Sequence, residues 1–333
     1  MTKIAINGFG RIGRNALRVI ESRHPDLELV AVNDLTKPED LLFLTKYDTV
    51  LGNYPHKISY DGDNIIANGQ TIRVFQEKDP TNLPWDELGI DVVIESTGKF
   101  RDRQAASAHL NAGAKRVVLS APGKGVDGTF VVGVNDQNLT EEMTIISAAS
   151  CTTNCLAPMA KTLHDSFGIV DGIMTTIHAY TGDQQLVDAP HKDQRRARAA
   201  AQNMIPTSTG AAKAIGEVIP DLKGKLDGFA MRVPVITGSA TDLTVELDHE
   251  VSIEEVNEAF KKASETPELS GRLVYSTDPL VSADIATTPA ACTYDAPLTK
   301  SIGRVVKVIG WYDNEYGYTC QMLDLVERAA DTL

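Results

Sequence analysis

The first half of the chain switches repeatedly between two patterns of apolar residues. Short and nearly continuous apolar runs are typical of strands that are buried on both faces. Segments between several of these runs place apolar side chains at intervals of three and four residues, which predicts helices. Strands and helices in this succession predict a doubly wound parallel sheet over residues 1–150. The expected strands are residues 3–8, 27–34, 90–98, 116–122 and 143–150, and the expected helices are residues 11–22 and 101–113.

The second half has a different pattern. After one more helical segment at residues 153–167, apolar and polar residues alternate over long stretches, as they do in half-buried strands. This alternation predicts an α+β domain over residues 151–314, with a mixed or antiparallel sheet and helices on one face. The amphipathic segment 315–333 is expected to form a helix that packs back onto the first domain. The other expected strands are residues 169–181, 229–247 and 304–315, and the other expected helices are residues 209–218 and 252–263.

Composition narrows the possible classes of function. A chain of 333 residues is long enough for two domains, and its formal net charge of −13 argues against nucleic acid or an anionic membrane as the main partner. No apolar run approaches the roughly 18 residues that span a bilayer. The N-terminal segment lacks the long apolar stretch and the cleavage site of a secretion signal, so we expect a cytoplasmic protein. Four cysteines in such a chain do not indicate a disulfide framework.

A glycine-rich turn lies between the first expected strand and the first expected helix. Gly8, Gly10 and Gly13 have the G-x-G-x-x-G spacing, a weak signal that gains meaning from this strand–turn–helix context. Such a turn lets a dinucleotide pyrophosphate approach the free N–H groups at the helix N-terminus. The second strand ends at Asp34, where a carboxylate would accept hydrogen bonds from the ribose hydroxyls and repel a 2′-phosphate. The pattern therefore predicts a Rossmann-type domain that binds NAD rather than NADP.

The stretch SAASCTTNCLAP, residues 147–158, holds two of the four cysteines. One C-x3-C pair does not supply the four ligands of a zinc site, so no metal is expected. A disulfide between residues four apart on a helix would strain the bond geometry. Cys151 stands where a strand ends and a helix begins, and there the helix dipole and free amides are expected to lower the pKa of its thiol. The other three cysteines are expected to be small buried apolar residues of the core, and they are Cys155, Cys292 and Cys320.

A reactive thiol needs a base, and the chain has seven histidines. His178 is a candidate because it ends an expected strand in the second half. The pattern alone does not decide between His178 and other histidines, such as His164 on the helix that follows Cys151.

Six segments carry a family resemblance. NGFGRIGR, SAASCTTNCLAP, TTIHAYT, RRARAAAQNMIPTSTGAAKA, MRVPV and WYDNEYGY occur in this order over nearly the whole chain. Together they resemble the phosphorylating glyceraldehyde-3-phosphate dehydrogenases, and SCTTNC is highly specific to that family. The resemblance implies the glycolytic oxidation of D-glyceraldehyde 3-phosphate, with NAD and inorganic phosphate, to 1,3-bisphosphoglycerate. Erythrose-4-phosphate dehydrogenase is the alternative from the same class, because the sequence does not reveal the size of the substrate pocket.

The resemblance also implies roles for single residues. Cys151 would attack the aldehyde to give a thiohemiacetal and then a thioester, with His178 as the base, before inorganic phosphate displaces the thiol. The residues implied to hold the attacking phosphate are Ser150, Thr152, Thr209 and Gly210. Those implied to hold the substrate phosphate are Thr181, Arg232 and Arg196, with Arg195 and Arg198 as alternatives in the same RRAR run.

For the cofactor, the resemblance implies a further set of contacts. Asn314 would bond the nicotinamide carboxamide, and Tyr318 would flank that ring. Lys78 stands where the family usually has arginine, which keeps the charge but loses the planar fork. Family members are homotetramers in which the loop around residues 180–203 reaches the neighbouring subunit, so a homotetramer is expected here. The other implied cofactor residues are Arg11, Ile12, Asp34, Thr97 and Ser120.

Overall fold

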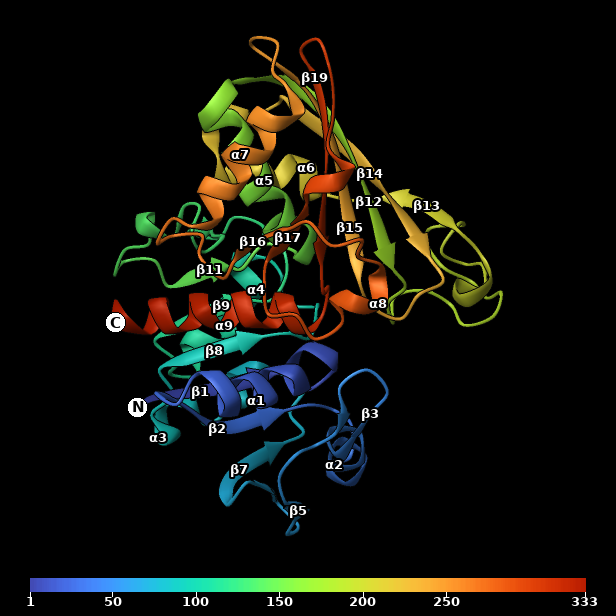
Figure 1. Cartoon of the computed structure of the whole chain (residues 1–333). Coiled ribbons are helices and arrows are strands. Elements are labelled where there is room, and N and C mark those ends of the chain that lie inside the picture. Colours follow the sequence, from blue (N-terminus) through green and yellow to red (C-terminus); the bar gives the residue numbers. More distant parts are fainter. The chain divides into compact units, whose positions relative to one another are not determined.

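The computed structural model describes residues 1–333, which form two compact units, each with its own sheet (Figure 1). None of the helices is both long and apolar enough to cross a membrane. The first unit comprises Met1–Phe130, Asp136–Ala149 and Met322–Leu333, and the second comprises Val131–Asn135 and Ser150–Gln321.

The first unit contains a nine-stranded sheet in the order β10-β11-β9-β8-β1-β2-β7-β6-β5. The pairings from β10 to β7 are all parallel, which confirms the predicted parallel sheet, although β7 and β10 were not among the expected strands. The strands β5 and β6 form an antiparallel edge that the sequence pattern did not indicate. The strands are β1 (Thr2–Asn7), β2 (Leu27–Asn33), β5 (Ile58–Tyr60), β6 (Asn64–Ala67), β7 (Gln70–Phe75), β8 (Val92–Glu95), β9 (Arg116–Leu119), β10 (Gly128–Thr129) and β11 (Ile145–Ser147), with β3 (Tyr47–Asp48) and β4 (Gly52–Asn53) as a separate pair.

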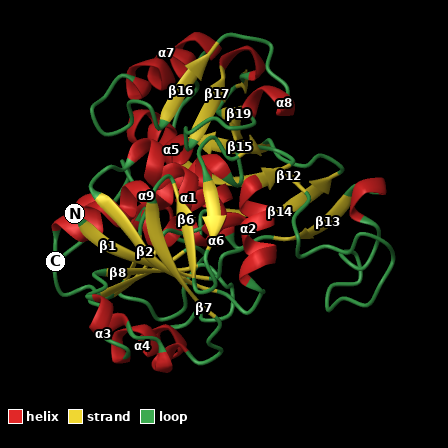
Figure 2. Ribbon diagram, turned by 90° about the horizontal axis from the view of Figure 1, so that it is seen from below, coloured by secondary structure: helices red, strands yellow, loops and turns green.

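Helices cover both faces of this sheet, with α1 on one side and α3 and α4 on the other (Figure 2). The helix α1 buries Ala16, Val19 and Ile20, which together with the half-buried Ile12 form the helical spacing that predicts it. The sheet therefore has the doubly wound arrangement, in which both faces of the parallel strands are covered. The helices of this unit are α1 (Arg11–Arg23), α2 (Pro38–Lys46), α3 (Trp85–Leu88) and α4 (Arg103–Asn111), together with the part of α9 (Tyr316–Asp331) that follows Gln321.

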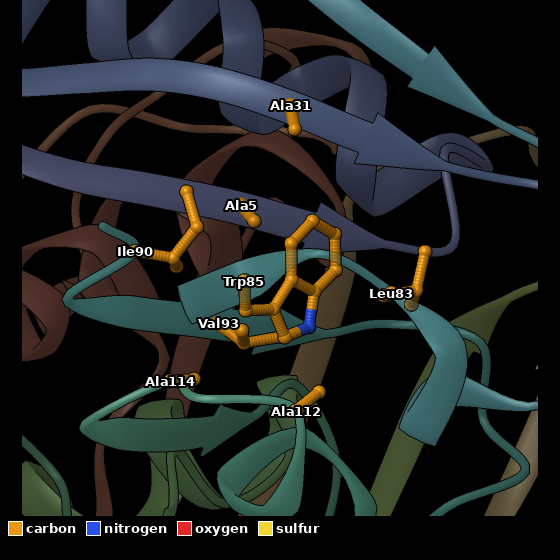
Figure 3. Packing of buried hydrophobic residues seen from close by; sticks show 8 residues of the cluster. All are labelled: Ala5, Ala31, Leu83, Trp85, Ile90, Val93, Ala112 and Ala114. Carbon is orange, nitrogen blue, oxygen red and sulfur yellow. The ribbon is translucent and has the colours of Figure 1, made fainter. Parts of the chain in front are cut away.

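Trp85 fills the layer between this sheet and one of its helix layers (Figure 3). Its ring is fully buried, and its only polar atom, Nε1–H, donates to the Nδ1 of His109 at 3.1 Å. A satisfied indole of this kind contributes a large apolar area without leaving a buried donor unpaired. The smaller side chains packed around it are Ala5, Ala31, Leu83, Ile90, Val93, Ala112 and Ala114.

The second unit contains a sheet in the order β13-β14-β12-β15-β19-β17-β16, with β18 paired to β19. The pairs β12·β14 and β16·β17 are parallel and the others antiparallel, which confirms the predicted mixed sheet. The expected strand over residues 229–247 is two strands, β14 and β15, which lie on either side of β12. The helices α5, α6 and α7 lie on one side of it (Figure 1). The strands are β12 (Ile169–Ala179), β13 (Ile205–Ser208), β14 (Leu226–Val233), β15 (Ser239–Leu247), β16 (Leu273–Ser276), β17 (Cys292–Asp295), β18 (Lys300–Ile302) and β19 (Val305–Tyr312), and the helices are α5 (Cys151–Phe167), α6 (Ala211–Val218), α7 (Ile253–Ser264) and α8 (Ser282–Ile285).

Candidate active site

Helix α5 begins at Cys151, with Ser150 as its N-cap. The Ser150 Oγ accepts the N–H of Thr153 at 3.0 Å and so satisfies one of the amides that lack a partner within the helix. Cys151 is a half-buried free thiol, so it alone among the four cysteines has the access that a nucleophile needs. The other three are fully buried, as predicted: Cys155, Cys292 and Cys320.

His178, near the end of β12, faces this thiol. Its Nε2 lies 3.4 Å from the Sγ of Cys151, and its Nδ1 lies 2.6 Å from the carbonyl oxygen of Ala179. Because a carbonyl oxygen can only accept, Nδ1 carries the proton, and the neutral imidazole presents the lone pair of Nε2 to the thiol. The structure thus places a thiol and a neutral imidazole in the orientation that proton transfer between them requires.

Burial disfavours a charge on either of these two groups alone. It raises the pKa of the Cys151 thiol to about 11, although Arg232 and the backbone N–H of Thr152 lower it. Burial, followed by the charge of Arg232, lowers the pKa of His178 to about 3. The prediction that the helix N-terminus lowers the pKa of this thiol is therefore wrong for the thiol by itself. Desolvation raises the pKa by more than the backbone amides lower it. A proton passed from Sγ to Nε2 creates two opposite charges that stabilise each other, so we expect the two groups to titrate as a pair.

Arg232, on β14, places a cation beside this pair. Its Nη1 donates to the Ala179 carbonyl oxygen and to the Thr181 Oγ1, both at 3.1 Å. Its Nε is buried without a hydrogen-bond partner. An unsatisfied buried donor costs about 1–3 kcal/mol, so this guanidinium is suited to a ligand anion that accepts the missing bond.

Among the three arginines of the RRAR run, Arg196 acts on the same site. Its Nε donates to the Oγ1 of Thr207 at 2.9 Å, and Thr207 lies on β13, which pairs with the strand β14 that carries Arg232. The Nη1 of Arg196 donates to Asp183 at 2.5 Å, and its guanidinium is mostly buried. Arg195 and Arg198 are exposed. The geometry therefore favours Arg196 over its two neighbours as a residue that contacts an anion here.

The residues expected around the attacking phosphate lie at two helix N-termini. The hydroxyl of Thr152 lies 2.8 Å from the Tyr312 hydroxyl in a buried network, so this side chain is already engaged. Thr209 precedes α6, where its Oγ1 accepts the first helical N–H at 3.2 Å, and Gly210 is the N-cap. The free N–H groups of the two helix ends are the donors that an anion would use.

In the first unit, a cavity of about 330 Å³ opens at the carboxyl ends of β8, β1 and β2. These strands are parallel neighbours, and their carboxyl ends meet at one edge of the sheet, where such sheets bind ligands. Its lining includes five residues that the sequence marked for the cofactor, namely Gly8, Gly10, Asp34, Lys78 and Thr97.

Two glycines of the turn are required by the backbone itself. Gly8 has a φ of +96°, and a Cβ there would lie 2.6 Å from the backbone nitrogen of Thr97. A Cβ on Gly13 would lie 2.4 Å from the carbonyl oxygen of Gly8. By contrast, a Cβ on Gly10 would meet no atom within 4 Å, so the space before the N-terminus of α1 is open to a phosphate.

Asp34 is fixed at the end of β2 by two backbone amides. Its Oδ2 accepts the N–H of Phe9 at 2.8 Å, and its Oδ1 accepts the N–H of Thr36 at 2.9 Å. Each carboxylate oxygen keeps a further lone pair. The side chain can therefore accept hydroxyl groups of a ligand in the cavity without giving up its own anchors.

A buried polar chain beneath the cavity was not predicted. Asn33 donates to Asn7 at 2.7 Å, and Asn7 donates to Glu95 at 2.6 Å. Glu95 also accepts the N–H of Thr97 at 2.8 Å and pairs with His109 at 3.1 Å. A signal was present in the sequence, because β1, β2 and β8 all end in a polar residue. Polar residues at the carboxyl ends of buried parallel strands mark the edge where ligands bind.

Three more residues marked for the cofactor lie in the first unit. Arg11 and Ile12 begin α1 and are half-buried, and the Arg11 guanidinium pairs with Asp48. Ser120 follows β9, where its N–H donates to the carbonyl oxygen of Glu95 at 3.0 Å. Because the Arg11 side chain is engaged by Asp48, the main chain of this first helical turn is the part suited to a pyrophosphate.

Asn314 and Tyr318 lie in the second unit, and each is 5% exposed. The Oδ1 of Asn314 accepts a hydrogen bond from the Ser239 Oγ at 2.9 Å, whereas its Nδ2 is buried without a partner. An amide N–H₂ in this state fits the carbonyl oxygen of a carboxamide, such as that of nicotinamide.

Comparison with known proteins agrees with these features. Residues 2–103 match the glyceraldehyde 3-phosphate dehydrogenase NAD binding domain, and residues 150–314 match the glyceraldehyde 3-phosphate dehydrogenase C-terminal domain. The chain is 55% identical to the glyceraldehyde-3-phosphate dehydrogenase of Streptomyces coelicolor, over 97% of each chain. It is 54% identical to that of Mycolicibacterium smegmatis over 99% of each chain, and 55% identical to that of Geobacillus stearothermophilus over 98% of each.

Proposed function

The chain belongs to the glyceraldehyde-3-phosphate dehydrogenase family, and we propose that it oxidises D-glyceraldehyde 3-phosphate, with NAD and inorganic phosphate, to 1,3-bisphosphoglycerate. The observation that carries this proposal is the 3.4 Å contact between the Cys151 Sγ and the His178 Nε2. The relatives compared above are all named for glyceraldehyde 3-phosphate, which favours this substrate over erythrose 4-phosphate.

Cys151 carries the substrate through two covalent states. As Sγ bonds to the aldehyde carbon, its proton passes to the Nε2 of His178 and then to the aldehyde oxygen, giving a thiohemiacetal. His178 next accepts the hydroxyl proton while the hydrogen on carbon leaves as hydride, and a thioester remains. Bound NAD supplies the hydride acceptor. An oxygen of inorganic phosphate then attacks the thioester carbon, the C–S bond breaks, and the thiolate leaves as the acyl phosphate forms.

This chemistry requires two anions to be held in a protein whose net charge is −13. Local cations and helix N-termini supply the attraction. The unpaired Nε of Arg232 supports a role for that residue in binding the substrate phosphate. With it we assign Thr181 and Arg196, and we assign Ser150, Thr152, Thr209 and Gly210 to the attacking phosphate.

The dependence on phosphate tests the proposal. With NAD and glyceraldehyde 3-phosphate, absorbance at 340 nm should rise steadily only when inorganic phosphate is present. Without phosphate, NADH should stop forming after about one equivalent per active thiol, because the thioester has no acceptor. Steady turnover without phosphate, or a higher kcat/KM for erythrose 4-phosphate, would contradict the proposal.

The choice of cofactor gives a prediction for Asp34. Asp34→Asn keeps an oxygen that accepts the amide of Phe9, loses the second acceptor, which faces the amide of Thr36, and removes the charge that repels a 2′-phosphate. We expect the preference for NAD over NADP, measured as a ratio of kcat/KM values, to fall by about tenfold, or ~1.4 kcal/mol. Asp40→Asn, an exposed position on α2, is the control and should leave the ratio unchanged. A wild-type enzyme that prefers NADP would refute the repulsion argument.

We also propose a cytoplasmic homotetramer, which rests on the family resemblance alone. Its mass should be four times the 36.0 kDa of the chain, and light scattering on the purified protein measures it directly.

A further inference from the structure

We propose that Ser239 is a positioning residue that sets the orientation of the Asn314 amide and couples it to the residue next to the catalytic base. The inference rests on the proposed function, since it concerns the nicotinamide end of the cofactor. Ser239 begins β15, and its hydroxyl is completely buried. Nothing in the sequence pattern singled out this residue.

The hydrogen bonds of Ser239 determine which way the amide faces. The backbone N–H of Ala179 donates to the Ser239 Oγ at 3.1 Å, so this oxygen is an acceptor there. Its single proton is then directed to Asn314, at 2.9 Å. A hydroxyl that donates must meet an acceptor, and the amide atom facing Ser239 is therefore Oδ1. The opposite orientation would leave the buried proton of Ser239 without a partner.

This orientation leaves the other end of the amide available. Ser239 holds Oδ1, whereas the Thr237 Oγ1, 3.5 Å from Oδ1, has a closer acceptor in the Asp313 Oδ1 at 3.2 Å. The Nδ2 is the amide atom that remains without a partner. The same side chain would offer an oxygen in place of this donor if it rotated by 180°. Ser239 thus fixes a donor, rather than an acceptor, where a carboxamide oxygen would bind.

The backbone around Asn314 is held separately, by the buried carboxylate of Asp313. Its Oδ1 accepts the N–H groups of Glu315 at 2.8 Å and Tyr316 at 2.9 Å, and its Oδ2 accepts that of Thr287 at 2.7 Å. Loss of the Ser239 hydroxyl therefore leaves the main chain around Asn314 in place. It releases the side-chain amide and also removes the acceptor of the Ala179 N–H. At the Asn314 end, the effect of Ser239 is therefore on the orientation of the amide and not on the backbone.

Ser239 also touches the catalytic side of the unit. Ala179, whose N–H it accepts, receives the Nδ1–H of His178 on its carbonyl oxygen at 2.6 Å. One hydroxyl thus connects the segment that fixes the tautomer of the base with the side chain that faces the cofactor. The orientations of His178 and Asn314 thus both involve the hydrogen bonds of Ala179 and Ser239.

The test compares two ligands that differ only in the nicotinamide ring. In Ser239→Ala, we expect the Kd for NAD, measured by calorimetry on the full-length protein, to rise about tenfold, while the Kd for ADP-ribose changes less than twofold. Asn314→Ala should reproduce this pattern. In the Asn314→Ala background, Ser239→Ala should add less than a twofold change, because two residues that act through one contact are not additive.

Thr241 offers a matched control on the same strand. It is fully buried, points to the same face two residues further on, and its Oγ1 has no hydrogen-bond partner. Thr241→Val should leave both Kd values unchanged. Equal weakening of NAD and ADP-ribose by Ser239→Ala, or no weakening of either, would overturn the inference. Absence of phosphate-dependent turnover in the wild type would refute the proposed function. The two Kd values do not depend on turnover, so they would still test the role of Ser239.

Discussion

Replacing Cys151 by serine is expected to lower kcat by about a thousandfold or more, as removal of a covalent nucleophile does in other enzymes. The serine hydroxyl ionises far less readily than a thiol, and its neighbours do not compensate, because burial already raises the pKa of the thiol itself to about 11. Any acyl group that did form would be an ordinary ester, a poorer donor to phosphate. The rate of NADH formation at saturating phosphate measures the loss.

Cys155 provides the control for this variant. It lies one helical turn further along α5, fully buried, with its Sγ 3.5 Å from the Gly310 carbonyl oxygen. Cys155→Ala should retain activity within about threefold and lower the unfolding temperature instead, since it removes a buried apolar group. Trapping with substrate and NAD should place the acyl adduct on Cys151. Full activity in Cys151→Ser, or an adduct on another residue, would reject the assignment.

The sequence predicted those parts of the site in which chain order and strand–helix alternation determine the position. The glycine turn had to follow β1, and Asp34 had to stand at the end of β2, because parallel strands deliver their carboxyl ends to one edge. Cys151 was identified by the junction of strand and helix together with the family motif. These features are local, so a single segment of sequence is enough to predict them.

The parts that the sequence did not reveal depend on pairings between distant residues. Ser239 lies 75 positions from Asn314, and Asn7 lies 88 from Glu95. A serine on a strand and an asparagine in a turn have many possible partners, and only the register of the sheets selects one. The edge strands β5 and β6 were missed for a related reason, since short strands such as these give little periodic signal.

The pKa of the Cys151 thiol also depends on distant residues, so the sequence does not predict it. A helix N-terminus predicts a lowered value, and that argument uses only the local dipole. The desolvation that outweighs it comes from the whole surroundings of Cys151, which no single segment determines. The pair with His178 therefore has to be tested as a unit, and this leads to the last prediction.

His178→Asn is expected to lower kcat by about a hundredfold or more, the usual contribution of a general base. The variant should also change the reactivity of the thiol in the absence of substrate. In this variant the Nε2 that lies 3.4 Å from the thiol and can accept its proton is absent. Only Arg232 and the nearby amides then stabilise the thiolate, while burial disfavours it. Its pKa then rises relative to the wild type. The rate of alkylation by iodoacetamide, measured from pH 5 to 10, should fall at least tenfold at pH 7, with the midpoint of the profile displaced to higher pH.

His249→Asn is the matched control, because His249 is an exposed histidine in the same unit. It should leave both kcat and the alkylation profile unchanged. A structural role for His178 would lower kcat without moving the midpoint of alkylation, whereas a base that shares a proton with Cys151 must move both. An unchanged midpoint in His178→Asn would therefore show that the 3.4 Å contact does not control ionisation of the thiol, and the proton transfer proposed between Sγ and Nε2 would have to be abandoned.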